Sequence, residues 1–202
     1  MLRYWDWSLD WESLVDSPVL DVSTGFGGDG DPNGAKTVGS GRCVIDGPFA
    51  NLRPLYYNMN DNPHCLSRGF WDGQELGRLP GSDVSPRAIE AILSQADYES
   101  FFLALEHGPH NVIPNSIRGD FLKFTAPSDP LFFLHHTQLD RIWWLWQNRH
   151  PTQRLTEYTG NSTHNAKRKA DLHDVLRVGP IGPDIQVKEV MHTRGQMLCY
   201  MY

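Results

Sequence analysis

One stretch, residues 128–147 with the sequence SDPLFFLHHTQLDRIWWLWQ, constrains the fold of this chain more than any other. Ser128 is suited to cap a helix, Asp129 to favour the positive end of its dipole, and Pro130 to occupy the first helical position. Proline follows His150, which disfavours helical backbone at that residue. The stretch therefore predicts a helix of roughly five turns that ends near His150.

One face of this helix is expected to carry an aromatic and apolar stripe around a histidine. At about 100° per residue, the residues that share this face are Phe132, Phe133, His136, Leu139, Trp143 and Trp146. Gln138, Arg141 and Asn148 are expected to point away from the stripe, and His135 about a quarter turn from His136. A histidine in such a stripe is either a core residue with a satisfied hydrogen bond or a metal ligand.

The spacing Asp-Pro-x-Phe-Phe-x-x-His-x-x-x-Asp, from Asp129 to Asp140, resembles the second copper signature of the tyrosinase and catechol oxidase family. The resemblance implies a mainly α-helical fold, a helix bundle with long loops and little strand. It also implies that His136 is a ligand of the copper called CuB, and that Asp140 could orient a ligand imidazole. Imidazole is a suitable ligand for copper.

A second histidine-bearing segment precedes this helix. In the family, the first two CuB histidines lie four residues apart, and His110 matches the first of them by its Pro-His-Asn context. The second would fall at Pro114, which cannot bind a metal. His107 lies three residues before His110 and could face the same metal if the backbone were helical. Gly108-Pro109 argues against a continuous helix, so a solvated or core His107 is the alternative.

Two residues beside His110 are candidates for proton transfer. Some family members carry a carboxylate near the position of Glu106, and an Asn at the position of Asn111 is associated there with the handling of monophenols. The resemblance implies that the two side chains together hold a water that accepts a phenolic proton, as a general base does. The alternative is a surface glutamate and an ordinary turn asparagine.

The other copper of the family, CuA, has no histidines in this sequence. Tyr4-Trp-Asp-Trp resembles a segment that follows the CuA histidines in the family, and no histidine precedes His64. We therefore expect residues 1–202 to be a single copper domain that is truncated at its N-terminus, with its core at residues 85–150. The chain would be either a fragment or a half-site protein, with an inner face exposed to self-association.

Composition limits the other partners. The 202 residues are 40% hydrophobic and carry a net charge of −6 without a basic run, which gives no reason to expect nucleic acid or an anionic membrane as partner. No stretch has transmembrane length, and no signal peptide is recognisable at Met1; the compartment is left open. Cys43 and Cys65 could form a disulfide in an oxidising compartment, and the cysteine total of three leaves at least one unpaired within the chain.

Further elements follow from local signals. Ser85-Pro86 predicts the start of one helix and Asp97 the cap of the next. The glycine-rich segment 23–42 predicts a long loop. Residues 166–176 are expected to form a short helix or turn, and residues 185–190 a strand.

The function implied by the resemblance is a copper oxidoreductase that uses dioxygen to oxidise phenols or catechols to quinones. That chemistry requires both coppers, so the isolated chain is expected to be weakly active or inactive. One alternative is a non-catalytic or mononuclear copper-binding domain. Another is a dioxygen-binding relative of the haemocyanin type, which the missing CuA histidines disfavour.

Overall fold

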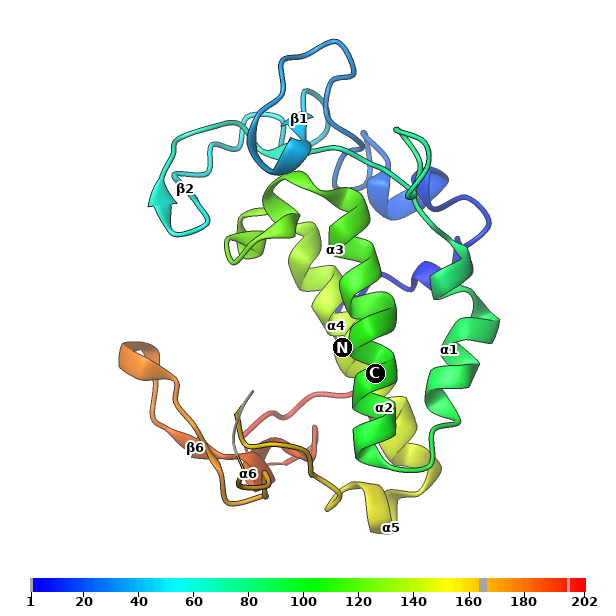
Figure 1. The fold of residues 1–202 in the computed structure, drawn as a ribbon, viewed down its shortest axis with the longest axis vertical. Coiled ribbons are helices and arrows are strands. Elements are labelled where there is room, and N and C mark those ends of the chain that lie inside the picture. Colours follow the sequence, from blue (N-terminus) through cyan, green and yellow to red (C-terminus); the bar gives the residue numbers. More distant parts are fainter. Residues whose placement is uncertain (1, 164–166, 196) are drawn as a thin grey trace.

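Three helices that run in two directions form the centre of the molecule. The computed structural model describes residues 2–163, 167–195 and 197–202. Helices α2 (Tyr98–Leu105) and α3 (Asn111–Ile117) stand nearly end to end along the long axis, and α4 (Leu131–Arg149) packs behind them (Figure 1). Helix α1 (Pro86–Leu93) lies beside this group and contacts both α2 and α4. The mainly α-helical prediction is confirmed.

The starts of the first two helices are as the sequence predicts. The Ser85 hydroxyl accepts a hydrogen bond from the backbone N–H of Ala88 at 3.3 Å, and the Asp97 carboxylate accepts one from Ser100 at 2.8 Å. Both side chains thereby satisfy an N–H that has no partner within the helix.

The passage from α2 to α3 is interrupted, as Gly108-Pro109 indicates. Residues Glu106–His110 form a π-helical turn in which Gly108 leaves the helical conformation, with ψ at −120°. Helix α3 then ends at Arg118, whose φ is +59°. Gly119 follows with φ +57°, and a Cβ there would lie 1.9 Å from the carbonyl oxygen of Ser67. Only glycine fits this close approach.

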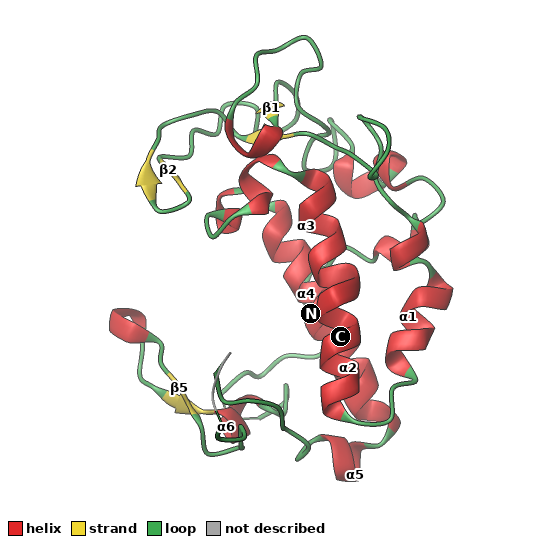
Figure 2. Cartoon of the chain, viewed as in Figure 1, coloured by secondary structure: helices red, strands yellow, loops and turns green. Residues whose placement is uncertain are grey.

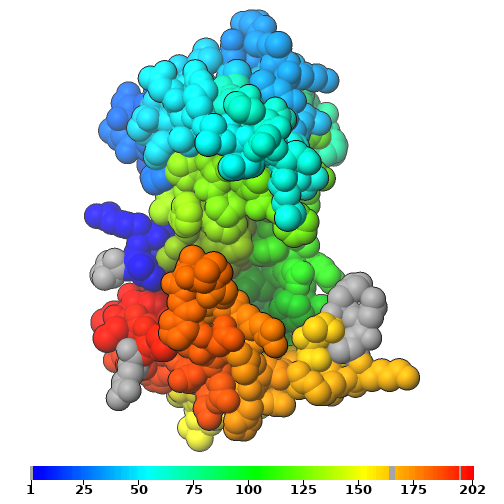
Figure 3. All heavy atoms as spheres, turned by 90° about the vertical axis from the view of Figure 1, so that its left-hand side faces the viewer, coloured from blue at the N-terminus to red at the C-terminus, as the bar shows by residue number. Residues whose placement is uncertain are grey.

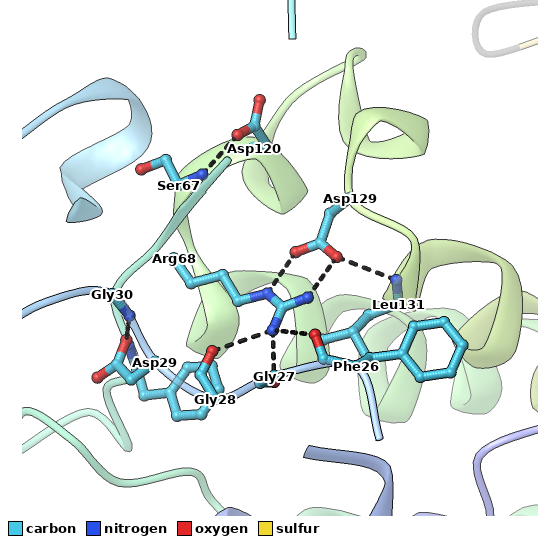
Figure 4. Close-up of polar contacts among 11 residues, drawn as sticks. Phe26, Gly27, Gly28, Asp29, Gly30, Ser67, Arg68, Asp120, Asp129 and Leu131 are labelled. Carbon is cyan, nitrogen blue, oxygen red and sulfur yellow. Dashed lines mark hydrogen bonds and ion pairs between the residues drawn. The ribbon is translucent and has the colours of Figure 1, made fainter. Parts of the chain in front are cut away.

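The start of α4 differs from the prediction. Ser128 closes a short 3-10 turn (Ala126–Ser128), and no side chain caps the helix at Pro130. The Asp129 carboxylate instead accepts a hydrogen bond from the backbone N–H of Leu131 at 3.0 Å. Asp129 can do this because an ion pair with the fully buried Arg68 holds its side chain inward (Figure 4).

The strands are short and peripheral (Figure 2). They form antiparallel pairs: β1 (Arg42–Cys43) with β4 (Ser67–Arg68), β2 (Tyr56–Tyr57) with β3 (Asn60–Asp61), and β5 (Val175–Leu176) with β6 (Ile185–Gln186). A disulfide joins Cys43 to Cys65 at the first pair, as the sequence allowed. Together with the loops of residues 23–66, the β1–β4 and β2–β3 pairs lie at the end of the helices near α3, whereas β5 and β6 lie beside α6 towards the other end.

The C-terminal segment corrects one prediction in part. Of residues 185–190, only Ile185–Gln186 is strand, because Gln186 and Glu189 form a capping box that starts α6 (Val187–Val190). Within 166–176, residue 166 lies outside the described residues, and the rest is turn followed by β5. Helix α5 (Pro151–Arg154) directly follows α4. The remaining elements are 3-10 turns: Trp7–Leu9, Leu14–Asp16, Pro18–Leu20, Val38–Ser40, Ser82–Val84, Gly119–Leu122 and Gly179–Ile181.

The core lies between α1, α2, α4 and the N-terminal segment. Its largest buried side chains include Trp5, Trp7, Phe101 and Trp146, and the rings of Phe101 and Trp146 stack at 4.7 Å. Among the described residues, no helix combines the length and apolarity needed to cross a membrane.

The buried face of α4 is rotated from the predicted stripe. Its fully buried members include Leu131, His135 and Ile142, with Gln138 only 1% exposed. Phe133, expected inside, is 57% exposed. Gln138 tolerates burial because its amide donates to the Asp6 carboxylate at 2.9 Å.

Candidate metal centre

His110 and His136 come together from different elements. His110 ends the π-helical turn and precedes α3, while His136 lies in the second turn of α4. Their ring centroids are 5.5 Å apart, and the ring planes are nearly perpendicular at 83°. Both side chains are half-buried. The structure thus brings together the two histidines that the sequence analysis favoured most as ligands.

Neighbouring side chains orient the two rings. His110 Nδ1 lies 3.1 Å from Asn111 Oδ1, so the ring donates there and leaves Nε2 for another partner. Phe132, one turn before His136, packs against that ring with centroids 4.1 Å apart. Within the described part of the chain, no hydrogen bond reaches the His136 ring, so its nitrogens are available to a ligand.

The charge state of His136 suits metal binding. Burial, with a smaller contribution from nearby His110, lowers the pKa of His136 to about 4. The ring is therefore neutral at neutral pH. Neutral imidazole is the form that binds metal ions, since its nitrogen lone pair is free.

Two cavities meet at this histidine pair. The first, of about 430 Å³, is lined by aromatic and apolar side chains of α2 and α4 with two carboxylates, Glu106 and Asp140. The second, of about 550 Å³, extends towards the loop after α3 and includes Asn111, Pro114 and Phe132 in its walls. His110 and His136 line both cavities, so a metal held between them could be approached from two sides. Figure 3 shows the helical residues (green and yellow-green) as a narrower waist between the two ends of the molecule.

The His107 side chain does not join His110 and His136 at the two cavities. Its side chain is exposed and lines neither cavity. The described residues contain no group of three or more His, Cys, Asp or Glu side chains placed to hold a metal ion. The assignment of His107 as a third ligand stays a prediction.

Glu106 and Asn111 flank His110 on different sides. Glu106 lies on the wall of the first cavity, and Asn111 on the wall of the second. Their joint action on one water stays a prediction. Pro114, where the resemblance would place a histidine, is half-buried in the second cavity.

Asp140 accepts hydrogen bonds from two tyrosines of the C-terminal segment. Its Oδ2 accepts hydrogen bonds from the Tyr200 hydroxyl at 2.6 Å and from the Tyr202 hydroxyl at 2.5 Å. Burial, followed by these hydrogen bonds to Asp140, raises the pKa of both tyrosines. Asp140 makes no hydrogen bond to a histidine among the described residues. Sequence reasoning missed the two tyrosines because no local pattern connects positions 60 residues apart.

His135 is a residue for whose burial the sequence analysis made no prediction. It is completely buried, and its ring lies 5.4 Å from that of His136 and 6.3 Å from that of His110. The spacing Leu131, His135, Gln138, Ile142 is itself a helical stripe. This second stripe, less aromatic than the one around His136, is the sequence signal that indicates the burial of His135.

The residues present fit a copper ion as part of its ligand set. The two imidazole rings lie 5.5 Å apart in half-buried positions, and imidazole nitrogen is a ligand type that copper prefers. The carboxylates of Glu106 and Asp140 line the same cavity. A further ligand would have to come from such an oxygen, from water or from a residue that moves.

Comparisons with known proteins agree on one family. The family model described as the common central domain of tyrosinase matches residues 1–149. The protein named tyrosinase ustQ, from Aspergillus flavus, is 47% identical over 199 residues, which cover 98% of this chain and 56% of that protein. The tyrosinase-like protein phomQ1', from Diaporthe leptostromiformis, is 46% identical over 219 residues, which cover 100% of this chain and 58% of the relative.

A solved structure shows the same fold. The structure of a polyphenol oxidase variant from Thermothelomyces thermophila superposes with a TM-score of 0.77 at 26% identity, and the match covers 98% of this chain and 65% of that one. The chain thus spans little more than half the length of the two curated relatives it matches.

Proposed function

This chain belongs to the tyrosinase family, and from that premise we propose that it is a copper-binding oxidoreductase that oxidises phenols or catechols to quinones with dioxygen. The observation that carries the proposal is the meeting of His110 and His136 at 5.5 Å between two cavities. Copper, when bound, supplies the electron transfer between phenol and dioxygen that side chains alone lack.

Each residue of the pair has a defined part in the proposal. His136 binds the metal as a neutral imidazole, packed on one side by Phe132. His110 binds through Nε2, because its Nδ1–H donates to Asn111. Such a partner fixes the ring orientation of a metal-bound histidine. A third imidazole at His107 would have to turn inward from its exposed position.

The first cavity suits an aromatic substrate. Its walls include Tyr98, Phe102, Leu105 and Trp143, which offer apolar contact to a phenol ring. In the proposal, the Glu106 carboxylate accepts the phenolic proton, and Asn111 assists from the other side of His110. In a version of the protein extended with the histidines of the family's other copper, Glu106→Gln should then lower turnover of a monophenol while copper content stays unchanged.

The second copper of the family would need its own histidines, and the resemblance assigns none of the histidines of this sequence to it. We therefore expect the 202-residue chain with copper to oxidise catechol weakly or not at all. A version extended with the other copper's histidines should be active. Dioxygen uptake with a simple catechol, measured for both proteins, tests this expectation. Robust turnover by the short chain that is lost in His136→Ala would overturn it.

Copper content tests the site itself. The purified protein, loaded with copper and freed of excess metal, should retain about one copper per chain by mass spectrometry, as a site for one of the two coppers requires. The substitutions His136→Ala and His110→Ala should remove it, and His107→Ala tests the third ligand. The control is His173→Ala, because the His173 side chain is 73% exposed and lies outside both cavities. Equal copper in His136→Ala and the control would refute the assignment.

A mononuclear, non-catalytic copper domain is the second candidate. It is favoured by Pro114, which stands in the second cavity where the resemblance would place a histidine ligand. This candidate predicts tight copper binding without dioxygen uptake, in the extended protein as well as in the short chain.

A further inference from the structure

The backbone carbonyl of His110 lacks its regular helical donor. His110 is the N-cap of α3, and the carbonyl at that position normally accepts a hydrogen bond from the N–H four residues later. That residue is Pro114, which has no N–H. A carbonyl left unpaired in a half-buried position is costly, so another donor is expected nearby.

His135 supplies a donor to this carbonyl. Its Nε2 lies 3.4 Å from the carbonyl oxygen of His110. The ring is completely buried. A carbonyl oxygen can only accept a hydrogen bond, so Nε2 of His135 carries a proton.

The other ring nitrogen of His135 has no hydrogen-bond partner among the described residues. This Nδ1 is buried, and the buried indole Nε1–H of Trp7 is likewise unpaired there. The two rings lie 5.4 Å apart. The indole can only donate, and Nδ1 of a ring protonated on Nε2 can only accept. The unpaired acceptor and the unpaired donor thus belong to neighbouring rings.

We propose that His135, fixed as the Nε2–H tautomer between Trp7 and the His110 carbonyl, is a positioning residue that replaces the backbone donor lost at Pro114. It thereby holds the backbone of His110 at the helix start and sets the orientation of that side chain towards His136. The hydrogen bond and tautomer are properties of the metal-free chain, whereas the effect on copper rests on the function proposed above.

The tautomer is tested directly by nitrogen NMR on the full 202-residue protein without metal. The His135 ring should show a protonated Nε2 and an unprotonated Nδ1 at neutral pH. His173 serves as the reference for a solvent-exposed ring, with its Nδ1 3.4 Å from Asp171 Oδ1. A proton on Nδ1, or a charged ring, would overturn the proposal without any variant.

The link to Pro114 is tested by a double-mutant cycle. His135→Phe keeps an aromatic ring of similar size and removes the donor, and His135→Gln restores an amide donor near the Nε2 position. Pro114→Ala returns the backbone N–H. In the natural background, His135→Phe should lower the urea midpoint and weaken copper binding by about tenfold, a typical loss when a residue that supports a ligand is removed. His135→Gln should recover most of the loss.

In the Pro114→Ala background, His135→Phe should have a much smaller effect on both measurements. Equal losses in the two backgrounds would show that the carbonyl does not depend on His135, which refutes the proposal. If the wild-type chain binds no copper but shows the expected tautomer and coupled urea midpoints, the proposed function fails and this inference stands. If His135→Phe does not fold, recovery of folding by added Pro114→Ala supports the proposal and its absence counts against it.

Discussion

Asp129→Asn should destabilise the protein severely, because it leaves a buried guanidinium without its counter-charge. Arg68 and Asp129 are both fully buried and meet in two parallel contacts, Nε to Oδ2 at 2.8 Å and Nη2 to Oδ1 at 2.9 Å. The remaining Nη1 donates to the carbonyl oxygens of Phe26, Gly27 and Gly28 at 2.6–3.2 Å (Figure 4). These carbonyls satisfy hydrogen-bond donors but cannot neutralise the charge.

The magnitude follows from this burial. Removal of one partner from a buried ion pair costs about 3–5 kcal/mol, because water cannot reach the charge left behind. The native state of a domain is stable by only about 5–15 kcal/mol. The asparagine can still accept a hydrogen bond from the Leu131 N–H, so this contact at the start of α4 is kept and the loss of stability reports mainly the charge pair. Copper binding at His136 should weaken in parallel as folding is lost.

Urea denaturation followed by circular dichroism measures the loss, with Glu90→Gln as the matched control. Glu90 also meets an arginine in two contacts, at 2.9 Å and 2.7 Å to Arg149, but those side chains are 62% and 37% exposed. An exposed pair contributes at most about 1 kcal/mol. A loss for Asp129→Asn no larger than that of the control would show that the buried pair is dispensable, and the argument from burial would fail.

Three further predictions concern the site, the disulfide and alkaline pH. Pro114→His should bind copper more tightly than Pro114→Ala, since it places a third imidazole in the cavity shared by His110 and His136; equal affinities in a chelator competition would contradict this. Replacement of Cys43 and Cys65 by serine should lower the unfolding free energy by about 3 kcal/mol, the loop entropy for a separation of 22 residues, and an unchanged urea midpoint would speak against it. Burial raises the pKa of Tyr98 to about 12 from 10.0. The neutral Tyr98 hydroxyl therefore contributes its full share of stability below pH 10, and that share is lost as pH rises from 10 towards 12. The phenolate absorbance of wild type, compared with that of Tyr98→Phe, measures the pKa in the folded state, and titration of Tyr98 near pH 10 would refute the prediction.

Local signals predicted much of the helical framework. Ser85 and Asp97 cap helices as expected, and the break at Gly108-Pro109 is present. Each of these effects acts within a few residues, so sequence alone carries the information. The start of α4 was predicted one residue too early, because the role of Asp129 depends on Arg68, which lies 61 residues away.

The face of α4 shows the limit of periodicity. The predicted aromatic stripe is buried in part, at Leu139 and Trp146, while Phe133 is exposed. The helix also buries a neighbouring stripe, because Gln138 donates to Asp6 and His135 to the His110 carbonyl. Such partners come from distant parts of the chain, so no count of apolar residues along α4 reveals them.

The meeting of His110 with His136 was predictable only through the family resemblance. His136 carries a specific motif, and His110 was recognised by its Pro-His-Asn context. The exposure of His107 was not predictable with certainty, because a π-helical turn rotates the residues before and after it relative to a regular helix.

The fluorescence of Trp143 can report metal binding at the first cavity. It lines the first cavity together with His136, seven residues earlier on the same helix and roughly 10 Å away along the axis. A paramagnetic ion that settles between the two imidazoles would quench the emission of this indole, whereas a diamagnetic ion such as zinc would leave it bright. Occupancy could then be followed in real time by fluorescence in unlabelled protein, and Trp143→Phe would identify the share of the signal that comes from this single ring.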